Sequence, residues 1–506
     1  MSKRPARWDR RQFLSASAAA VAAGSVTTAG AAEADAASAR PAQGGAARGS
    51  RPASGSSVED TDVLVIGAGL SGLHAAMLLE DGGAKVQVIE ARDRIGGRVW
   101  TLSNLPGYPE VGGNTFGGAY GRVLDRVRQM GLSLTDYTPR RALSPGLELV
   151  LGGELISRER WKDHPRNPFQ GPLRERMPWE VGGGLVARNN PLKAPEDWLA
   201  PANAALDVSA HQYARSLGLD DAAASMAFSV NPYFGSSGHD VSALMHLFND
   251  AFVKVSMAVS MQSLFVTGGN QQLPRAMASK LRREVHLRRE VTSIVTDASG
   301  VTVSCADGTR YRAKACIASL PFSVLRTIRI EPGLQGPQDV AVKTLPYMVN
   351  TLVFMVPTRP FWESDGLATS MWTDGLIGTL SAQRFGTDPK EITGFVANPR
   401  GIAGAWLDRL PQAEAKARVL AEIERIRPAA RGALRVVAMH SWATDRHSAG
   451  DWAVYQPGQV TAFGNHTSTA AGRLHFCGEH TARANRGMEG AMESGERAAI
   501  EVLEQL

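Results

Sequence analysis

Three glycines and one acidic residue near the start of the chain have the types and spacing of a phosphate-binding turn. Gly67, Gly69 and Gly72 form a G-x-G-x-x-G pattern, and Glu90 follows 18 residues after the last glycine. The first glycine permits a tight turn, the second lets backbone approach a pyrophosphate, and the third lets a helix pack closely on a strand. A carboxylate at the position of Glu90 accepts hydrogen bonds from ribose hydroxyls. Together these residues predict dinucleotide binding, and an ordinary glycine turn is the alternative.

The elements needed to hold this turn can be recognised on both sides of it. Residues 62–66 are a short apolar run rich in β-branched side chains, which is typical of a buried parallel strand. Residues 73–79 have a helical pattern, and residues 85–89 form a second strand candidate. The helix begins at the turn, so its N-terminus, with Leu70 and Ser71, is expected to attract the phosphates.

The residues that follow Glu90 indicate which dinucleotide is bound. The segment 90–98 reads E-A-R-D-R-I-G-G-R, and it resembles the E-x-R-x-R-x-G-G-R segment of the flavin amine oxidase family, the superfamily of monoamine oxidases and L-amino-acid oxidases. Gly97 allows a close backbone pass, and Arg98 can neutralise a pyrophosphate with its planar fork of donors. The resemblance implies FAD, with Ala91 and Arg92 also in its site, whereas a basic surface loop is the alternative.

Two further segments extend the resemblance. Residues 112–115 are Gly-Gly-Asn-Thr, and a Gly-Gly segment of the family passes over the flavin ring system at this place. Residues 474–495 resemble a strand ending in Gly-Glu, followed by a helix that opens in an M-E-G-A pattern. A backbone N–H near the start of that helix would meet flavin N1 and O2, where reduction places negative charge. The further cofactor contacts implied are Gly112, Gly113, Asn114, Thr115, Val291, Gly478, Glu479 and Met488.

The substrate residues are assigned from departures from the monoamine oxidase pattern. Trp452 matches the first of two tyrosines that flank the substrate nitrogen, and Gly487 matches the second. One aromatic wall is therefore kept, and the other is open for a bulkier substrate or for a residue from elsewhere. An aromatic face favours an amine by cation–π attraction. Asp451 occupies the position of a covalent flavin-linking cysteine, so non-covalent FAD is expected.

Two more positions indicate which electron acceptor and which class of substrate to expect. Leu352 stands where many relatives carry a lysine near flavin N5, which disfavours fast reaction with oxygen and leaves a small redox protein as an alternative acceptor. Thr115 stands where L-amino-acid oxidases hold the substrate carboxylate with an arginine. We therefore expect an amine without an α-carboxylate, although an arginine could arrive from another loop. No side-chain base is obligatory if a neutral amine transfers hydride to flavin N5 and the resulting imine hydrolyses.

The expected fold is an α/β flavoprotein of two interleaved domains. A Rossmann-like FAD-binding domain with a β-meander is assigned to residues 59–138, 265–330 and 437–506. A substrate domain of mixed sheet and helices is assigned to residues 139–264 and 331–436. The meander is predicted at residues 291–313, and residues 345–355 are a further strand candidate.

Composition excludes several other classes. The 506 residues are 43% hydrophobic and carry a net charge of only +6, so no nucleic-acid partner is inferred. Three cysteines give neither a disulfide framework nor metal-ligand spacing, and no metal is expected. A homodimer is compatible with the sequence, and the oligomeric state stays open.

The first 32 residues resemble a twin-arginine signal. Arg10-Arg11 precedes an uncharged stretch rich in Ala, Ser, Thr and Gly, and residues 33–58 are a low-complexity linker. A membrane anchor and an alanine-rich tail are the alternatives. The signal predicts a periplasmic or secreted enzyme.

The function predicted is FAD-dependent oxidation of an amine. An L-amino-acid oxidase is the second hypothesis, and a carotenoid-type desaturase ranks lower. A flavin-binding protein without turnover is the hypothesis from another class, and the three cofactor signatures together disfavour it.

Overall fold

The computed structural model describes residues 61–142 and 146–506. The predicted signal and the whole of the predicted linker lie outside the described residues, so both stay predictions.

A four-stranded parallel sheet carries the glycine-rich turn at one end of its first strand. The strand order is β2-β1-β13-β20, with β1 (Val63–Ile66), β2 (Val86–Ile89), β13 (Ala315–Ala318) and β20 (Leu474–Phe476). Every residue of these strands is buried, which explains their nearly continuous apolar sequences. Because the strands are parallel, their carboxyl ends meet at one edge, which is where open α/β sheets bind ligands.

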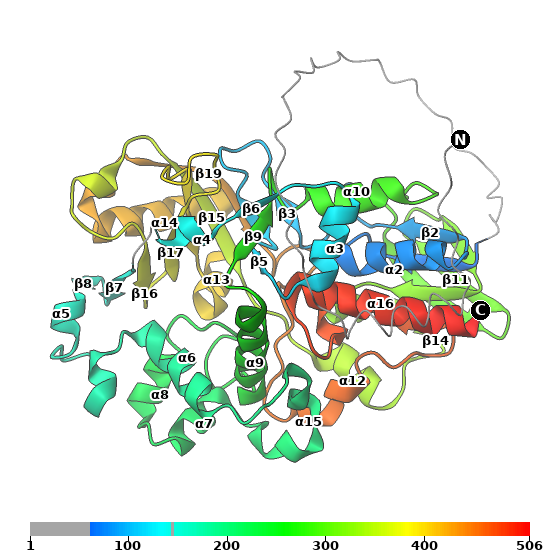
Figure 1. The fold of residues 1–506 in the computed structure, drawn as a ribbon, viewed down its shortest axis with the longest axis horizontal. Coiled ribbons are helices and arrows are strands. Elements are labelled where there is room, and N and C mark those ends of the chain that lie inside the picture. Colours follow the sequence, from blue (N-terminus) through cyan, green and yellow to red (C-terminus); the bar gives the residue numbers. More distant parts are fainter. Residues whose placement is uncertain (1–60, 143–145) are drawn as a thin grey trace, which may run out of the picture.

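Two helices from opposite ends of the described chain pack together beside this sheet. Figure 1 shows α2 (Leu70–Asp81, blue) running alongside α16 (Gly487–Gln505, red). A Cβ at Gly495 would lie 2.3 Å from the carbonyl oxygen of Ser71, so only glycine permits this approach. The helices α3 (Gly121–Gln129) and α10 (Gln272–Lys280) complete the layer.

The predicted β-meander is confirmed. It consists of β10 (Val291–Asp297), β11 (Gly300–Cys305) and β12 (Arg310–Ala313), which pair antiparallel in sequence order. The strand β14 (Arg329–Glu331) joins β10 in parallel.

A seven-stranded sheet forms the centre of the other half of the molecule. Its order is β19-β15-β18-β17-β16-β7-β8, with β7 (Glu148–Leu151), β8 (Glu154–Ile156), β15 (Thr351–Pro357), β16 (Met371–Thr373), β17 (Thr379–Gln383), β18 (Gly394–Asn398) and β19 (Leu434–Ser441). The strand predicted at residues 345–355 was wrong at its start, because Tyr347 and Asn350 make only isolated bridges and the ladder begins at Thr351. Apolar residues of this sheet and of α14 (Gln412–Ile426) share one hydrophobic core.

Residues 158–206 are rich in proline and fold into short helices and 3-10 turns. Several of these prolines mark the start of a helix. Pro178, Pro195 and Pro201 each stand at the first position, where a missing N–H costs nothing. The remaining helices are α4 (Thr138–Ala142), α5 (Arg158–Trp161), α6 (Pro178–Asn189), α7 (Ala210–Ser216), α8 (Asp221–Phe228), α9 (Ala243–Val259), α11 (Phe322–Leu325), α12 (Gly336–Thr344), α13 (Gly401–Leu407) and α15 (Gln459–Phe463), with 3-10 turns at Gly171–Glu175, Pro195–Leu199, Pro201–Leu206, Phe361–Glu363, Pro428–Ala430, Gly464–His466 and Glu479–Thr481.

Five short strands lie between the two halves. They form a pair, β3 (Trp100–Thr101) with β4 (Glu110–Gly112), and a triplet of β5 (Phe116–Gly117), β9 (Ser263–Val266) and β6 (Leu134–Asp136). Within residues 61–142 and 146–506, no helix is both long and apolar enough to cross a bilayer. In the same ranges, no group of three or more His, Cys, Asp or Glu side chains is placed to hold a metal ion.

Candidate active site

A cavity of about 440 Å³ extends from the carboxyl ends of β1 and β2 to β15 and the start of α16. Every predicted cofactor-binding or substrate-side residue except Gly72 contributes to its wall. The structure therefore brings together segments that are up to about 400 positions apart in the sequence.

The dinucleotide end of the cavity is built by the first βαβ unit. The carboxylate of Glu90 is buried and accepts the backbone N–H groups of Ala68 and Arg92, each at 2.9 Å. These two bonds fix the carboxylate at the cavity wall, where it still has acceptor capacity for ribose hydroxyls. A Cβ built on Gly69 meets no atom within 4 Å, so space for a ligand remains directly above the start of α2.

Gly72 has a different role from the other two glycines. It does not line the cavity, and a Cβ there would lie 2.1 Å from the carbonyl oxygen of Gly67. This agrees with the packing role that the motif gives its third glycine, and direct contact of Gly72 with a cofactor stays a prediction.

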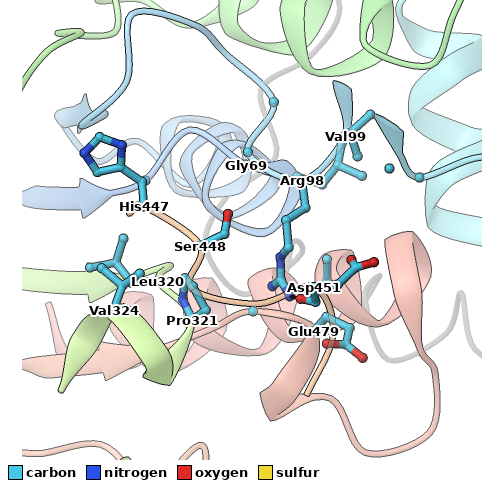
Figure 2. Close-up of a pocket in the computed structure, with 18 of the residues that line it drawn as sticks. Gly69, Arg98, Val99, Leu320, Pro321, Val324, His447, Ser448, Asp451 and Glu479 are labelled. Atoms are coloured by element: carbon cyan, nitrogen blue, oxygen red, sulfur yellow. Dashed lines mark hydrogen bonds between the residues drawn. The ribbon is translucent and has the colours of Figure 1, made fainter. Parts of the chain in front are cut away.

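Two arginines after Glu90, Arg92 and Arg98, have different roles in the site. Arg92 borders the cavity, but its guanidinium is bound to Asp445 at 2.6 Å and to the hydroxyl of Ser448 at 2.8 Å. Arg98 extends toward Asp451, with Glu479 beyond it (Figure 2), and donates to the backbone carbonyl of Asp451. Arg98 is therefore the arginine placed to face a pyrophosphate or ribityl group.

Two flanking segments that the sequence analysis did not identify close this part of the cavity. Leu320, Pro321 and Val324 lie across from Gly69, next to the loop that carries His447 and Ser448 (Figure 2). The sequence feature that could have pointed to Leu320, Pro321 and Val324 is that they form an apolar segment directly after the buried strand β13.

The Gly-Gly segment lies where backbone packs most closely. A Cβ on Gly112 would lie 2.3 Å from the carbonyl oxygen of Arg98, and Gly113 has φ +68°, a conformation that favours glycine. Asn270 donates from its side chain to the backbone carbonyls of Gly113 and Asn114, and this holds the segment against the cavity.

A buried acid supports that asparagine. Glu110 accepts the backbone N–H of Asn270 at 2.6 Å and the hydroxyl of Thr101 at 2.8 Å. Burial raises the pKa of Glu110 to about 8. The carboxyl group is therefore protonated at neutral pH in the folded protein.

The C-terminal segment supplies an acceptor that has no partner within the chain. Gly478 has φ +139°, and Oε2 of Glu479 is buried with no hydrogen-bond partner among the described residues. A buried carboxylate oxygen without a donor is costly, and a hydroxyl-bearing ligand in the cavity would satisfy it. Met488 stands in the first turn of α16, beside Gly113.

These features fit FAD. The space at Gly69, the fixed Glu90 carboxylate, the arginine at 98 and the unpartnered oxygen of Glu479 line one continuous cavity. None of the three cysteines lines it, since Cys305, Cys316 and Cys477 are buried in strands or at their ends.

At the far end of the cavity, two aromatic rings face each other. Trp452 and Tyr233 have ring centroids 6.0 Å apart and planes inclined by 28°. Tyr233 comes from the loop between α8 and α9, a region in which sequence reasoning found no site residue. Gly487 lines the same end with open space above it, because the nearest atom to a Cβ there is the Tyr120 hydroxyl at 3.8 Å.

Leu352 and Arg400 complete this end. Leu352 is 7% exposed and lies on β15, in an apolar cluster with Val111 and Trp442. Lys343, the lysine closest to it in sequence, lies on α12 and pairs with Asp339 at 2.6 Å. Arg400 follows β18 and reaches the cavity from a loop, and this residue also escaped sequence reasoning.

The fold and the cavity define a flavoprotein in which a dinucleotide-binding sheet is interleaved with a second, larger sheet. The family model for flavin containing amine oxidoreductases matches residues 70–503, and the chain belongs to this family. The predicted FAD-dependent oxidation of an amine is thereby confirmed as its class of activity.

Known relatives agree with this assignment. Human amine oxidase [flavin-containing] B is 28% identical over 475 residues, covering 87% of this chain and 86% of the relative. The zebrafish amine oxidase [flavin-containing] is 29% identical over 476 residues, with 87% and 85% covered. Among solved structures, putrescine oxidase bound to putrescine has a TM-score of 0.69, and cyclohexylamine oxidase from Brevibacterium oxydans has 0.70. Each is 24% identical, covers 88% of this chain and 99% of its own, and shows the likeness of fold.

Proposed function

We propose that the chain holds FAD without a covalent bond and removes a hydride from the carbon next to an amine nitrogen. The amine carbon loses the hydride, the nitrogen loses a proton, and the imine so formed is hydrolysed to an aldehyde or ketone with release of ammonia or an amine. The chemistry that bound FAD supplies is acceptance of that hydride at N5. The observation that carries the proposal is the Trp452–Tyr233 ring pair at the end of the cavity bordered by Gly112, Gly113 and Met488.

The chain's own residues bind and orient the amine and exclude water from it. The two rings present aromatic surface at this end of the cavity, and cation–π attraction favours an amine beside them before it is deprotonated. The first turn of α16, with Met488, presents backbone N–H groups that favour negative charge on a ligand at that point. Asp451 stands at the position of the linking cysteine, and its carboxylate accepts a bond from Asn350 at 2.6 Å, so it offers no covalent attachment.

The proposal is tested with the purified holoprotein. Acid precipitation should release yellow flavin into the supernatant, and an anaerobic screen of amines should find one that bleaches the flavin absorbance. Flavin that stays in the pellet would contradict non-covalent binding. A colourless protein with no affinity for FAD would contradict the whole proposal.

We further propose that oxygen is a poor electron acceptor and that a small redox protein takes the electrons. Support comes from Leu352, an uncharged side chain at the end of the cavity where a lysine assists oxygen in many relatives. Among the described residues that line this end of the cavity, no lysine is present.

Export is proposed as well, on the twin-arginine pattern alone. Fusing residues 1–58 to a reporter that is active only after translocation tests it, with Arg10→Lys and Arg11→Lys together as the control. A reporter that is exported equally well with both lysines would contradict twin-arginine transport.

A further inference from the structure

A guanidinium group lies at the substrate end of the cavity, and among the described residues no acidic side chain is hydrogen-bonded or ion-paired to it, although the charge of Asp451 acts on it through space. The side chain of Arg400 makes one hydrogen bond to the described residues, from Nε to the side-chain oxygen of Asn398 at 2.7 Å. Its two terminal nitrogens have no hydrogen-bond or ion-pair partner among these residues, and the side chain lines the cavity. Burial lowers the pKa of Arg400 below its ordinary value, as expected for a cation taken out of water.

The backbone holds Arg400 rigidly in this place. Arg400 forms an antiparallel bridge with Asn350, and the flanking N–H groups of Thr351 and Gly401 donate to Pro399 and Val349. Gly401 has φ +53°, and a Cβ there would lie 2.9 Å from the backbone of Ser236. The loop that carries Tyr233 is therefore docked directly on the Arg400 turn.

A chain of side-chain amides connects Arg400 to a carboxylate. Asn398 accepts from Arg400 and donates to the side-chain oxygen of Asn350, and Asn350 donates to Asp451. Every bond of this chain runs in the same direction, from the cation to the anion, so the bonds polarise one another. The effect is to fix the Nε edge of the guanidinium and to leave its other donors facing the cavity.

The aromatic pair lies beside these free donors. The carbon of the Arg400 guanidinium is 5.8 Å from the centroid of the Tyr233 ring, and Tyr233 faces Trp452. A simple alkylammonium entering this space meets a desolvated cation, which repels it. An amine that also carries an anionic group compensates that cation while its nitrogen remains beside the rings.

We propose that Arg400 binds a carboxylate on the substrate, so that the substrate is an amine that carries an acidic group. This inference rests on the proposed amine oxidation and replaces the expectation, drawn from Thr115, of a substrate without a carboxylate. Arg400 comes from a loop that follows β18, and Thr115 follows the Gly-Gly segment, so the carboxylate is held from a different side of the cavity. The indole N–H of Trp452, which is buried and has no hydrogen-bond partner among the described residues, is a further donor at this end.

The first test uses ligand binding to the oxidised holoenzyme. Benzoate and the uncharged benzamide are titrated while the flavin absorption spectrum is followed. We expect benzoate to perturb the spectrum and to bind at least about tenfold more tightly than benzamide, since a bond to a charged partner is the stronger one. Equal binding of the two probes by the unaltered protein would overturn the proposal without any variant.

Substitutions at two arginines then test whether Arg400 causes the preference for benzoate over benzamide. Arg400→Gln should weaken benzoate binding at least about tenfold and leave benzamide unchanged, and Arg400→Lys should restore part of the loss. Arg486 is the matched control, because it lies the same 5.8 Å from the Tyr233 ring but is bonded to Asn249 and does not line the cavity. Arg486→Gln should change benzoate binding less than about threefold. An equal loss in the two variants would show that overall charge, and not contact with Arg400, is responsible.

The second test compares substrates pairwise under anaerobic conditions. 4-Aminobutyrate is compared with butylamine, and phenylalanine with phenethylamine, by the rate at which each reduces the flavin at low concentration. At least one carboxylated member should be faster than its partner, and Arg400→Gln should abolish the difference. Faster reduction by both simple amines, unchanged in Arg400→Gln, would overturn the proposal. If no amine reduces the flavin, the proposed function fails, while the benzoate titration still decides the role of Arg400.

Discussion

Tyr233 and Trp452 stand with their ring centroids 6.0 Å apart, although they come from a loop between two helices and from a segment more than 200 positions further along. The sequence had placed only one aromatic wall, at Trp452, and had left the second position open at Gly487. In the structure the second ring enters from another direction, so the open space at Gly487 is kept.

Removing either ring should impair amine oxidation in a different way. Trp452→Ala should lower the rate of flavin reduction by roughly 2- to 30-fold, because cation–π and shape contacts worth about 0.5–2 kcal/mol are lost. Tyr233 is 49% exposed, so Tyr233→Ala should mainly raise KM. Anaerobic stopped-flow reduction measures both effects. Trp406→Ala, at an exposed tryptophan on α13, is the control. Unchanged turnover in Trp452→Ala would assign that residue to packing alone.

The glycines at 69 and 72 should respond to alanine in opposite ways. Gly69→Ala is sterically free within the protein and has an extended backbone (φ −81°), so the variant should fold, but its methyl group occupies space for the cofactor. Gly72→Ala places a methyl group 2.1 Å from a backbone oxygen, so it should destabilise the fold itself. Thermal unfolding and FAD titration, measured together, separate the two results. Normal FAD affinity in Gly69→Ala would show that the cofactor does not approach this residue.

Oxygen reactivity should increase when a cation is placed at Leu352. Leu352→Lys puts a positive charge where superoxide forms, in a site of low dielectric, and reoxidation by oxygen should accelerate at least about tenfold. Leu352→Met controls for the change of shape. The measurement is reoxidation of the amine-reduced enzyme after mixing with air-saturated buffer. If the unaltered enzyme already reoxidises as fast as it turns over with the best artificial acceptor, the role given to Leu352 is wrong.

Stability should fall as the pH rises through the titration range of Glu110. Burial raises the pKa of this carboxyl group from 4.5 to about 8, so the folded protein keeps a proton that the unfolded chain releases. The contribution of Glu110 to stability is therefore fully present below pH 4.5 and is lost progressively as the pH approaches 8.

Glu110→Gln keeps the size of the side chain and its acceptor for Asn270, and it should flatten this dependence by up to about 1.4 kcal/mol per pH unit. Urea unfolding at several pH values between 5 and 8 gives the comparison, with the exposed Glu504→Gln as control. An equal pH slope in Glu110→Gln and in the unaltered protein would show that the carboxyl group is not protonated when buried.

The cofactor half of the site could be predicted from the sequence because the residues that form it lie close together along the chain. Gly67, Glu90 and Arg98 belong to one βαβ unit and the loop that follows its second strand, where residue spacing largely determines which groups meet at the end of a strand. The C-terminal contacts Gly478 and Met488 are equally local, since a strand, a turn and a helix start define them.

The substrate half depends on pairing between distant segments. Arg400 reaches the cavity because its backbone bridges Asn350, and Tyr233 does so because its loop packs on Gly401. No periodic pattern in the sequence predicts either contact. An arginine that directly follows a buried strand in the sequence Asn-Pro-Arg-Gly was the signal that could have drawn attention to residue 400.

The strand order of the cofactor sheet also determines when the enzyme can first bind FAD during its synthesis. Strand β1, the first element that the structure describes, is two places from β20 in the sheet, and α2 packs on α16, which ends at Gln505. Among the residues that line the cavity, the last to be synthesised are Gly478, Glu479, Gly487, Met488 and Ala491. The growing chain therefore carries an incomplete sheet with an open edge until β20 has been synthesised, and the cavity for the cofactor can be completed only after that strand and the start of α16 have been made.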